Sequence, residues 1–169
     1  AEEWVKLAKD CGMKYFVVTS KHHDGFAMFH SKVDKYNVVD ATPFGRDVIG
    51  EIAEACYKHG LKMGLYYSQD LDWHHPDGGG YLSNHIPSQG VTWDNSWDFP
   101  DAANKNFDRC FNEKIYPQVE EILRNYGELC LIWFDMPMTL KEHQSRALFD
   151  AIKKYQPDCL INSRLGNGA

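Results

Sequence analysis

Residues 129–135, Leu129-Cys130-Leu131-Ile132-Trp133-Phe134-Asp135, decide the fold, because they form an apolar run that ends abruptly in a carboxylate. The run is rich in β-forming residues and too short for an ordinary helix. The chain-breaking pair Met136-Pro137 follows it, so it predicts a strand buried on both faces. An Asp at the C-terminal end of such a strand points into the mouth of a parallel sheet, where α/β folds carry their chemistry. Asp135 is therefore the candidate reactive group.

A helix is expected on each side of this strand. Before it, apolar residues at helical spacing predict a helix over 104–126, and Pro117 is expected to bend that helix. After it, Thr139 and Glu142 have the spacing of a capping box, which predicts a helix that opens there and runs through Tyr155.

The same alternation is expected nearer the start of the chain. The patterns predict helices over 2–11 and between Asp47 and Gly60, and strands over 14–20 and 61–68. A last strand is expected over 159–162. The first helix should bury one face, which is formed by Trp4, Leu7, Ala8 and Cys11.

This order of elements predicts the fold class. Helices and strands alternate without any hairpin signal, which is typical of an α/β fold with a parallel sheet and right-handed crossovers. Four such strands form either a small doubly wound sheet or about four βα units of a (β/α)8 TIM-type barrel. No glycine-rich nucleotide motif follows a strand. Polar and aromatic residues gather after the strands instead, so we favour the barrel.

Composition limits the function. The chain has 169 residues, of which 43% are hydrophobic, so it can bury one core. Its 24 acids and 18 bases give a net charge of -6 without long runs, a pattern that offers nothing to nucleic acid or a membrane surface and favours a neutral substrate. No apolar stretch reaches membrane length. The cysteines show no C-x-x-C spacing and are interpreted as buried thiols: Cys11, Cys56, Cys110, Cys130 and Cys159.

Four motifs, which lie at the ends of expected strands or just after them, carry a resemblance. They are Lys21-His22-His23-Asp24-Gly25-Phe26, then Gly64-Leu65-Tyr66-Tyr67-Ser68 with Asp72-Trp73, then Trp133-Phe134-Asp135-Met136, and finally Asn162-Ser163-Arg164-Leu165-Gly166. They occur in the order seen in the α-L-fucosidases of glycoside hydrolase family twenty-nine, so the chain resembles that family over nearly its whole length. The resemblance implies a retaining exo-fucosidase on a (β/α)-barrel that acts on fucosylated oligosaccharides or glycoconjugates, with no cofactor and no metal.

The resemblance also implies roles for particular residues. It puts Asp135 at the nucleophile position and implies a fucose pocket lined by His22, His23, Tyr67, Trp133 and Arg164. Chemistry agrees, because a retaining glycosidase needs an ionised carboxylate beneath the anomeric carbon and a protonated one about 5 Å away. A nucleophile stays charged when hydrogen-bond donors such as Arg164 and the histidine pair surround it.

Parts of the family pattern are missing. In the family the acid/base Glu lies beyond the Asn162–Gly166 motif, and no residue here takes that role; the family's first strand is also absent. We therefore expect residues 1–169 to be a partial catalytic domain, truncated at both ends and inactive alone, whose open sheet edges favour self-association. The resemblance implies a periplasmic, secreted or lysosomal protein, although no targeting segment is visible.

Each assignment has a structural alternative. Adjacent histidines reach one ligand only if the chain turns, for which Asp24-Gly25 is suitable. Tyr67 has the pattern of a half-buried strand end, Trp133 that of barrel core, and Arg164 that of an ion-pair partner. The apolar wall of the pocket is Trp133, Phe26 or Trp73.

Asp70, Asp72 and Trp73 either shape the rim of the pocket or hold the long loop 69–103 together, and we favour the second interpretation. Two other functions stay open. One is a metal-assisted hydrolase that uses His22 and His23. The other is a fucose-binding protein without catalysis.

Overall fold

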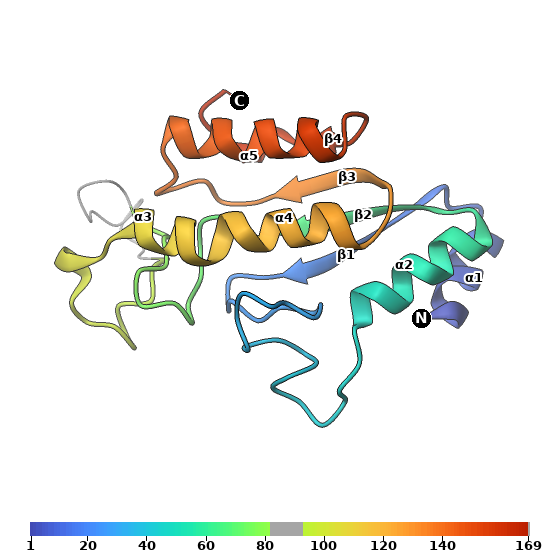
Figure 1. The fold of residues 1–169 in the computed structure, drawn as a ribbon, viewed down its shortest axis with the longest axis horizontal. Helices are drawn as coiled ribbons and strands as arrows, with labels where there is room; N and C mark the ends of the chain where they lie inside the picture. Colours follow the sequence, from blue (N-terminus) through green and yellow to red (C-terminus); the bar gives the residue numbers. More distant parts are fainter. Residues whose placement is uncertain (82–92, 169) are drawn as a thin grey trace.

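A computed structural model describes residues 1–81 and 93–168 of the chain, and part of the predicted loop 69–103 lies outside them. Four parallel strands form one sheet in the order β1-β2-β3-β4 (Figure 1). They are β1 (Tyr15–Lys21), β2 (Lys62–Tyr67), β3 (Leu129–Phe134) and β4 (Leu160–Ile161). The predicted α/β fold with a parallel sheet is confirmed.

The helices of the described residues are α1 (Glu2–Asp10), α2 (Val48–His59), α3 (Phe107–Cys110), α4 (Tyr116–Asn125) and α5 (Glu142–Tyr155). Helix α2 has the predicted ends. Its N-cap Asp47 accepts a hydrogen bond from the Gly50 N–H at 2.9 Å, and Gly60 closes it in the left-handed conformation with φ 68°.

The predicted capping box at Thr139 and Glu142 is wrong. The N-cap of α5 is Lys141, whose backbone N–H donates to Gln144 Oε1 at 2.9 Å. Thr139 is occupied elsewhere, because its hydroxyl donates to the Tyr81 carbonyl and its N–H donates to Asp70 Oδ2 at 2.6 Å. Thr139 therefore makes long-range hydrogen bonds to Asp70 and Tyr81 of the long loop in place of a local helix cap.

The predicted helix 104–126 is divided. A five-residue π-helical segment, Phe111–Ile115, separates α3 from α4 and comes just before Pro117. Proline has no N–H to donate to the carbonyl four residues earlier, so the backbone widens there. The single helix that the sequence predicts is therefore interrupted, and the interruption lies before Pro117, where a bend was expected.

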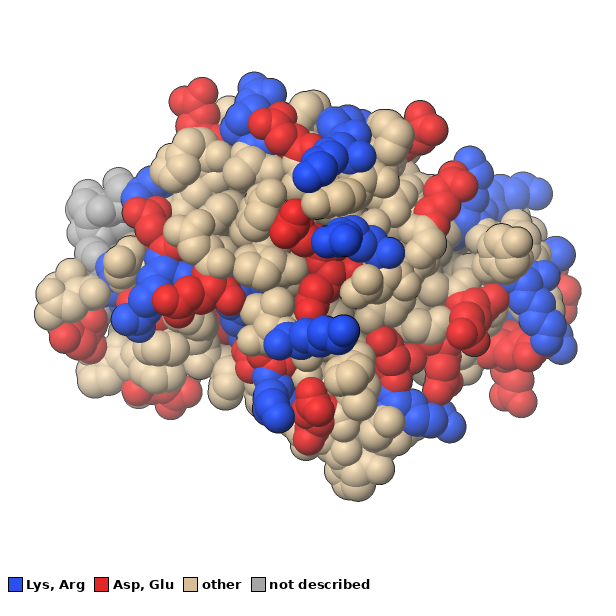
Figure 2. Space-filling view, viewed as in Figure 1, with Lys and Arg blue, Asp and Glu red and all other residues tan. Residues whose placement is uncertain are grey.

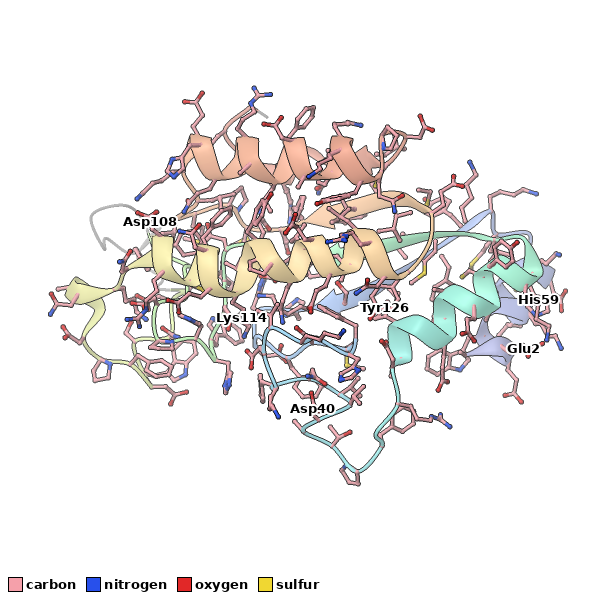
Figure 3. The ribbon with its side chains drawn as sticks, viewed as in Figure 1. Glu2, Asp40, His59, Asp108, Lys114 and Tyr126 are labelled. Atoms are coloured by element: carbon pink, nitrogen blue, oxygen red, sulfur yellow. The ribbon has the colours of Figure 1, made fainter. Side chains whose placement is uncertain are left out.

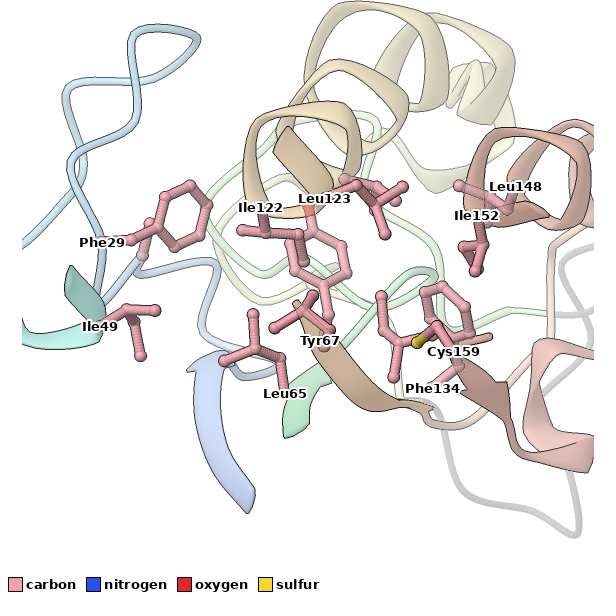
Figure 4. Close-up of a cluster of buried hydrophobic side chains, with 14 of the residues drawn as sticks. Phe29, Ile49, Leu65, Tyr67, Ile122, Leu123, Phe134, Leu148, Ile152 and Cys159 are labelled. Atoms are coloured by element: carbon pink, nitrogen blue, oxygen red, sulfur yellow. The ribbon is translucent and has the colours of Figure 1, made fainter. Parts of the chain in front are cut away.

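Within the described residues, helices cover one face of the sheet and leave the other open (Figure 1). Tyr67 and Leu65 of β2 pack beneath Ile122 and Leu123 of α4 in the core, and Figure 4 shows the cluster. On the opposite face, strand register places Thr19, Tyr66 and Trp133 in one row. That face is open, since Trp133 keeps 44% of its surface exposed. The prediction that the strand before Asp135 is buried on both faces is therefore wrong: Leu129, Ile132 and Phe134 are buried, whereas the face that carries Trp133 has no helix packed on it among the described residues.

The predicted buried face of α1 is wrong in part. Val5 and Ala8 are buried, whereas Trp4 is 61% and Leu7 64% exposed. Helix α1 packs through one side only, so part of its apolar stripe stays exposed to solvent. Among the five free thiols, Cys11 is exposed and Cys130 half-buried, while Cys56, Cys110 and Cys159 are buried as predicted.

The surface carries charges of both signs. On the face drawn in Figure 2, Lys and Arg side chains lie among Asp and Glu side chains, as expected from a sequence without long charge runs. Of the helices that the structure describes, none is both long and apolar enough to cross a membrane.

Candidate active site

Asp135 lies directly after β3, where its carboxylate is held on both oxygens. The Tyr66 hydroxyl donates to Oδ2 at 2.9 Å, and the Arg164 guanidinium donates to Oδ1. The next residue, Met136, has a positive φ of 53°, an uncommon conformation for a residue with a side chain. Such backbone outliers gather at functional sites.

The surroundings keep Asp135 ionised. Partial burial works to raise the pKa of this carboxyl, but the hydrogen bonds from Tyr66 and Arg164 outweigh it, and the pKa lies below its ordinary value. The carboxylate is therefore charged at neutral pH. A nucleophile in a retaining glycosidase needs this state.

Two amide side chains fix the backbone around the carboxylate. Gln69 is fully buried; its Oε1 accepts from the Asp135 N–H at 2.9 Å and its Nε2 donates to the Arg164 carbonyl at 2.8 Å. Asn162 extends the sheet beyond β4 by bonding both the N–H and the carbonyl of Phe134 at 2.9 Å. Asp135 and Arg164 are thus tied to one frame.

His23 faces Asp135 with an unprotonated nitrogen. Its Nδ1 lies 2.8 Å from Ser68 Oγ, and the Ser68 hydroxyl donates its only hydrogen to the Leu71 carbonyl, so it can only accept from Nδ1. We therefore assign the proton to Nδ1, which leaves Nε2, 3.9 Å from Asp135 Oδ2, as an acceptor. Burial and the neighbouring His22 lower the pKa of His23 to about 4, so the ring is neutral near pH 7. Nε2 can accept a ligand hydroxyl.

His22 joins the same site across a turn. Gly25, with φ 81°, donates its N–H to the His22 carbonyl, so the predicted turn at Asp24-Gly25 is confirmed. The His22 and His23 ring centroids lie 4.2 Å apart. The exposed His22 ring stacks on Tyr66, with centroids 5.4 Å apart. Both histidines thus reach the neighbourhood of Asp135.

The structure contradicts the placement of Tyr67 in the pocket. Tyr67 is fully buried between β2 and α4, and its hydroxyl donates to Gln118 Oε1 at 2.9 Å (Figure 4). Side chains alternate along a strand, so only one of two adjacent tyrosines can face the site. That residue is Tyr66. The hydrogen bond to Asp135 distinguishes Tyr66 from Tyr67, and the sequence alone does not reveal which of the two makes it.

Of the three aromatic candidates for the apolar wall of the pocket, two lie near Asp135 or His23 and one lies elsewhere. Trp133 shares a register position with Tyr66 on the open face, two residues before Asp135. Phe26 instead packs edge-on against Tyr36, with centroids 5.0 Å apart. The third candidate, Trp73, lies beside His23, with ring centroids 5.8 Å apart.

Beneath the histidine turn lies a buried ionic cluster, made of Lys21, Asp72, Lys114 and Asp34. Asp72 Oδ2 is 2.9 Å from both lysine ammonium groups, and Lys114 also reaches Asp34 at 2.7 Å. Lys114 donates to the Gly25 carbonyl at 3.2 Å, and Figure 3 shows it between the helix and the loops after β1. The cluster therefore supports the turn from below.

The acidic residues of the long loop hold it together, as we predicted. Asp72 Oδ1 accepts from the N–H groups of His74 and His75. Asp70 is fully buried and accepts from three backbone N–H groups, those of Gly80, Thr139 and Leu140.

A cleft of about 890 Å³ lies at the other end of the sheet, lined by residues that include Asp47, Tyr57, Met63 and Tyr126. It is remote from Asp135, which lies on the open face. Within the described residues, no three His, Cys, Asp or Glu side chains are grouped as a metal site.

Taken together, the parallel α/β sheet and the ionised strand-end carboxylate beside tyrosine, arginine and imidazole groups form a site of the kind that glycoside hydrolases use. The chain belongs to the alpha-L-fucosidase family, because the family model described as Alpha-L-fucosidase matches residues 1–169.

Solved structures agree. Unliganded alpha-L-fucosidase AlfC from Lactobacillus casei superposes with a TM-score of 0.93 at 67% identity, over 99% of this chain and 52% of that chain. An alpha-L-fucosidase from Vibrio sp. strain EJY3 gives 0.83 at 41% identity, over 97% of this chain and 27% of that one. Alpha-L-fucosidase 1 of Arabidopsis thaliana is 29% identical over 98% of this chain and 28% of its own length.

The chain thus spans about half the length of AlfC and a smaller share of the other two relatives. Its four-stranded sheet corresponds to part of the TIM-barrel catalytic domain of these fucosidases.

Proposed function

We propose that the complete protein is a retaining exo-α-L-fucosidase in which Asp135 is the nucleophile. The observation that carries this proposal is the ionised Asp135 carboxylate at the end of β3, held by Tyr66 and Arg164. A carboxylate oxygen attacks the anomeric carbon, the glycosidic bond breaks, and the leaving oxygen takes a proton from a second carboxyl. Water then attacks the fucosyl ester as that second group takes back a proton, which restores Asp135 and releases fucose.

The second carboxyl comes from elsewhere in the protein under this proposal. Glu128 is at the opposite end of β3, and Glu142 lies at the start of α5. The chain covers only about half of AlfC. Residues 1–169 then form a partial catalytic domain that needs the rest of the barrel for activity, and the open sheet edges favour self-association of the isolated segment.

The pocket residues suit a deoxy sugar. His23 Nε2 offers an acceptor for a hydroxyl, Arg164 offers donors, and His22 and Trp133 supply ring surface next to Asp135. A 6-deoxyhexose needs such a combination of polar partners and an apolar wall. AlfC, to which the chain is similar, has been solved with its α-L-fucose product.

Covalent trapping tests the nucleophile. A 2-deoxy-2-fluoro-α-L-fucosyl fluoride should inactivate the complete protein and add one 2-deoxy-2-fluorofucosyl group. The fluorine at C2 slows both formation and breakdown of the ester, and the good fluoride leaving group at C1 keeps formation fast enough for the ester to accumulate. Peptide mass spectrometry should find the label on Asp135, and proton NMR should show the α-anomer of fucose as first product. A label on another peptide would contradict the assignment.

The same experiment separates the alternative functions. A metal-assisted hydrolase using His22 and His23 would escape labelling and lose turnover to a chelator. A fucose-binding protein would show neither label nor turnover.

The two adjacent tyrosines provide a matched pair for a further prediction. Tyr66→Phe removes a donor from the Asp135 carboxylate, so kcat/KM on an aryl fucoside should fall by about tenfold or more. The lost bond also lets the pKa of Asp135 rise, so the acidic limb of the pH profile should move to higher pH.

Tyr67→Phe is the control, because it deletes a hydroxyl of the core. It should leave kcat/KM and its pH profile unchanged while lowering the free energy of unfolding by about 1–2 kcal/mol through the unpaired Gln118 oxygen. If the two variants exchanged these effects, the placement of Tyr66 beside the nucleophile would be wrong.

A further inference from the structure

A line of aromatic rings leads outward from the candidate active site. The Trp73 ring lies 5.8 Å from that of His23, and Trp97 stands edge-on to Trp73 at 5.5 Å between centroids. Trp97 is 60% exposed, although indole is among the largest apolar side chains. The line therefore connects the surroundings of Asp135 to an open indole surface.

The turn that carries Trp97 is firmly held. Asn95 is fully buried, and its Nδ2 donates to the carbonyls of Trp73 at 3.2 Å and His75 at 2.7 Å. Lys105 donates to the Asn95 side-chain oxygen, and the Phe99 N–H donates to the Asn95 carbonyl at 2.9 Å. The backbone that carries the exposed indole is thus held in place before any ligand arrives.

Trp73 is hydrogen-bonded both to the histidine turn and to the chain segment that leads to Trp97. Its backbone N–H donates to the His23 carbonyl at 2.8 Å, and its indole N–H donates to the Trp93 carbonyl at 2.9 Å. Trp73 consequently has a set position relative to the histidine turn, and its ring supports the Trp97 indole edge-on. A rigid aromatic surface loses little conformational entropy when it binds a ligand.

We propose that Trp97, supported by Trp73, binds the sugar unit to which fucose is attached. This inference rests on the proposed function, which puts the fucosyl unit above Asp135. The next pyranose along the glycan then extends outward past His23, and the C–H groups on one face of its ring match the exposed indole. The ligand class is a pyranose aglycone such as N-acetylglucosamine, and the interaction adds specificity without taking part in the bond cleavage.

Two substrates separate this role from catalysis. For the complete protein we choose Fuc(α1,6)GlcNAc, which has been seen bound to a variant of AlfC, and α-L-fucosyl fluoride, which has no sugar aglycone. Trp97→Ala should lower kcat/KM on the disaccharide by about tenfold and leave kcat/KM on the fluoride unchanged. Trp97→Phe, which keeps a ring, should recover part of the loss.

Trp4→Ala is the matched control, because Trp4 lies on α1 and is 61% exposed, almost the same fraction as Trp97. It should change neither rate. Equal losses on both substrates, or no loss on the disaccharide, would overturn the role of Trp97 alone. Absence of fluoride turnover by the unsubstituted protein would instead contradict the proposed function, and this inference with it.

Discussion

Asp135→Gly is expected to lower kcat of the complete protein for α-L-fucoside hydrolysis by at least about 10⁴-fold. The side chain that forms the covalent intermediate is then gone, while Tyr66 and Arg164 remain in place. Its removal also leaves room beneath the anomeric carbon. Azide should enter that room, attack in place of the carboxylate and restore measurable turnover, with β-L-fucosyl azide as product.

Glu128→Gln controls for a change of charge next to the same strand. Glu128 is exposed and precedes β3 at its other end, so this variant should keep the full rate. Steady-state kinetics with an aryl fucoside and NMR of the azide product provide the measurements. Full activity of Asp135→Gly, or absence of any azide adduct, would require another nucleophile.

Asp72→Ala is expected to produce the largest loss of stability, about 3–5 kcal/mol in the free energy of unfolding. Asp72 and Lys21 are both fully buried, and Lys114 is nearly so. Removing the carboxylate leaves buried ammonium groups facing each other with too little negative charge between them. It also deprives the His74 and His75 N–H groups of their acceptor. Urea denaturation of the complete protein measures the effect.

Asp108→Ala is the comparison, because its partner Lys141 is 53% exposed and exposed pairs contribute about 0–1 kcal/mol. The Asp72 effect should also depend on pH. Its two lysine partners overcome the burial and hold the pKa of Asp72 below the ordinary 3.8, so the stabilisation is complete above that value and disappears as the pH falls through the folded pKa. The gap between wild type and Asp72→Ala should therefore narrow in acid; a constant gap would show that the charge of Asp72 is unimportant.

Much of the fold could be predicted because local signals and tertiary structure agree. The apolar run of β3 specifies a strand, although only one of its faces is buried, and Asp47 and Gly60 close α2 by local hydrogen bonding. The turn after β1 was predictable for the same reason, since Gly25 takes a positive φ.

Other features depend on contacts between distant residues. Thr139 caps no helix because its polar groups bond to Asp70 and Tyr81, both far away in sequence. Gln69 was missed as a support of Asp135, although a polar residue just after a strand was a usable signal. The choice between Tyr66 and Tyr67 requires the pairing of β2 with β3, which no local pattern specifies.

That pairing has a consequence for how the protein folds. If β2 slipped by one position, Tyr67 would turn to the open face, Tyr66 would enter the core, and the carboxylate would lose the hydroxyl that holds it. Gly64 opposes such a slip, because a Cβ there would lie 3.0 Å from the Leu131 carbonyl oxygen, so neither Met63 nor Leu65 can replace it without strain. Molecules with the shifted register would be poor catalysts as well as unstable ones. The specific activity of a refolded sample therefore reports the fraction of molecules in which β2 and β3 are correctly paired.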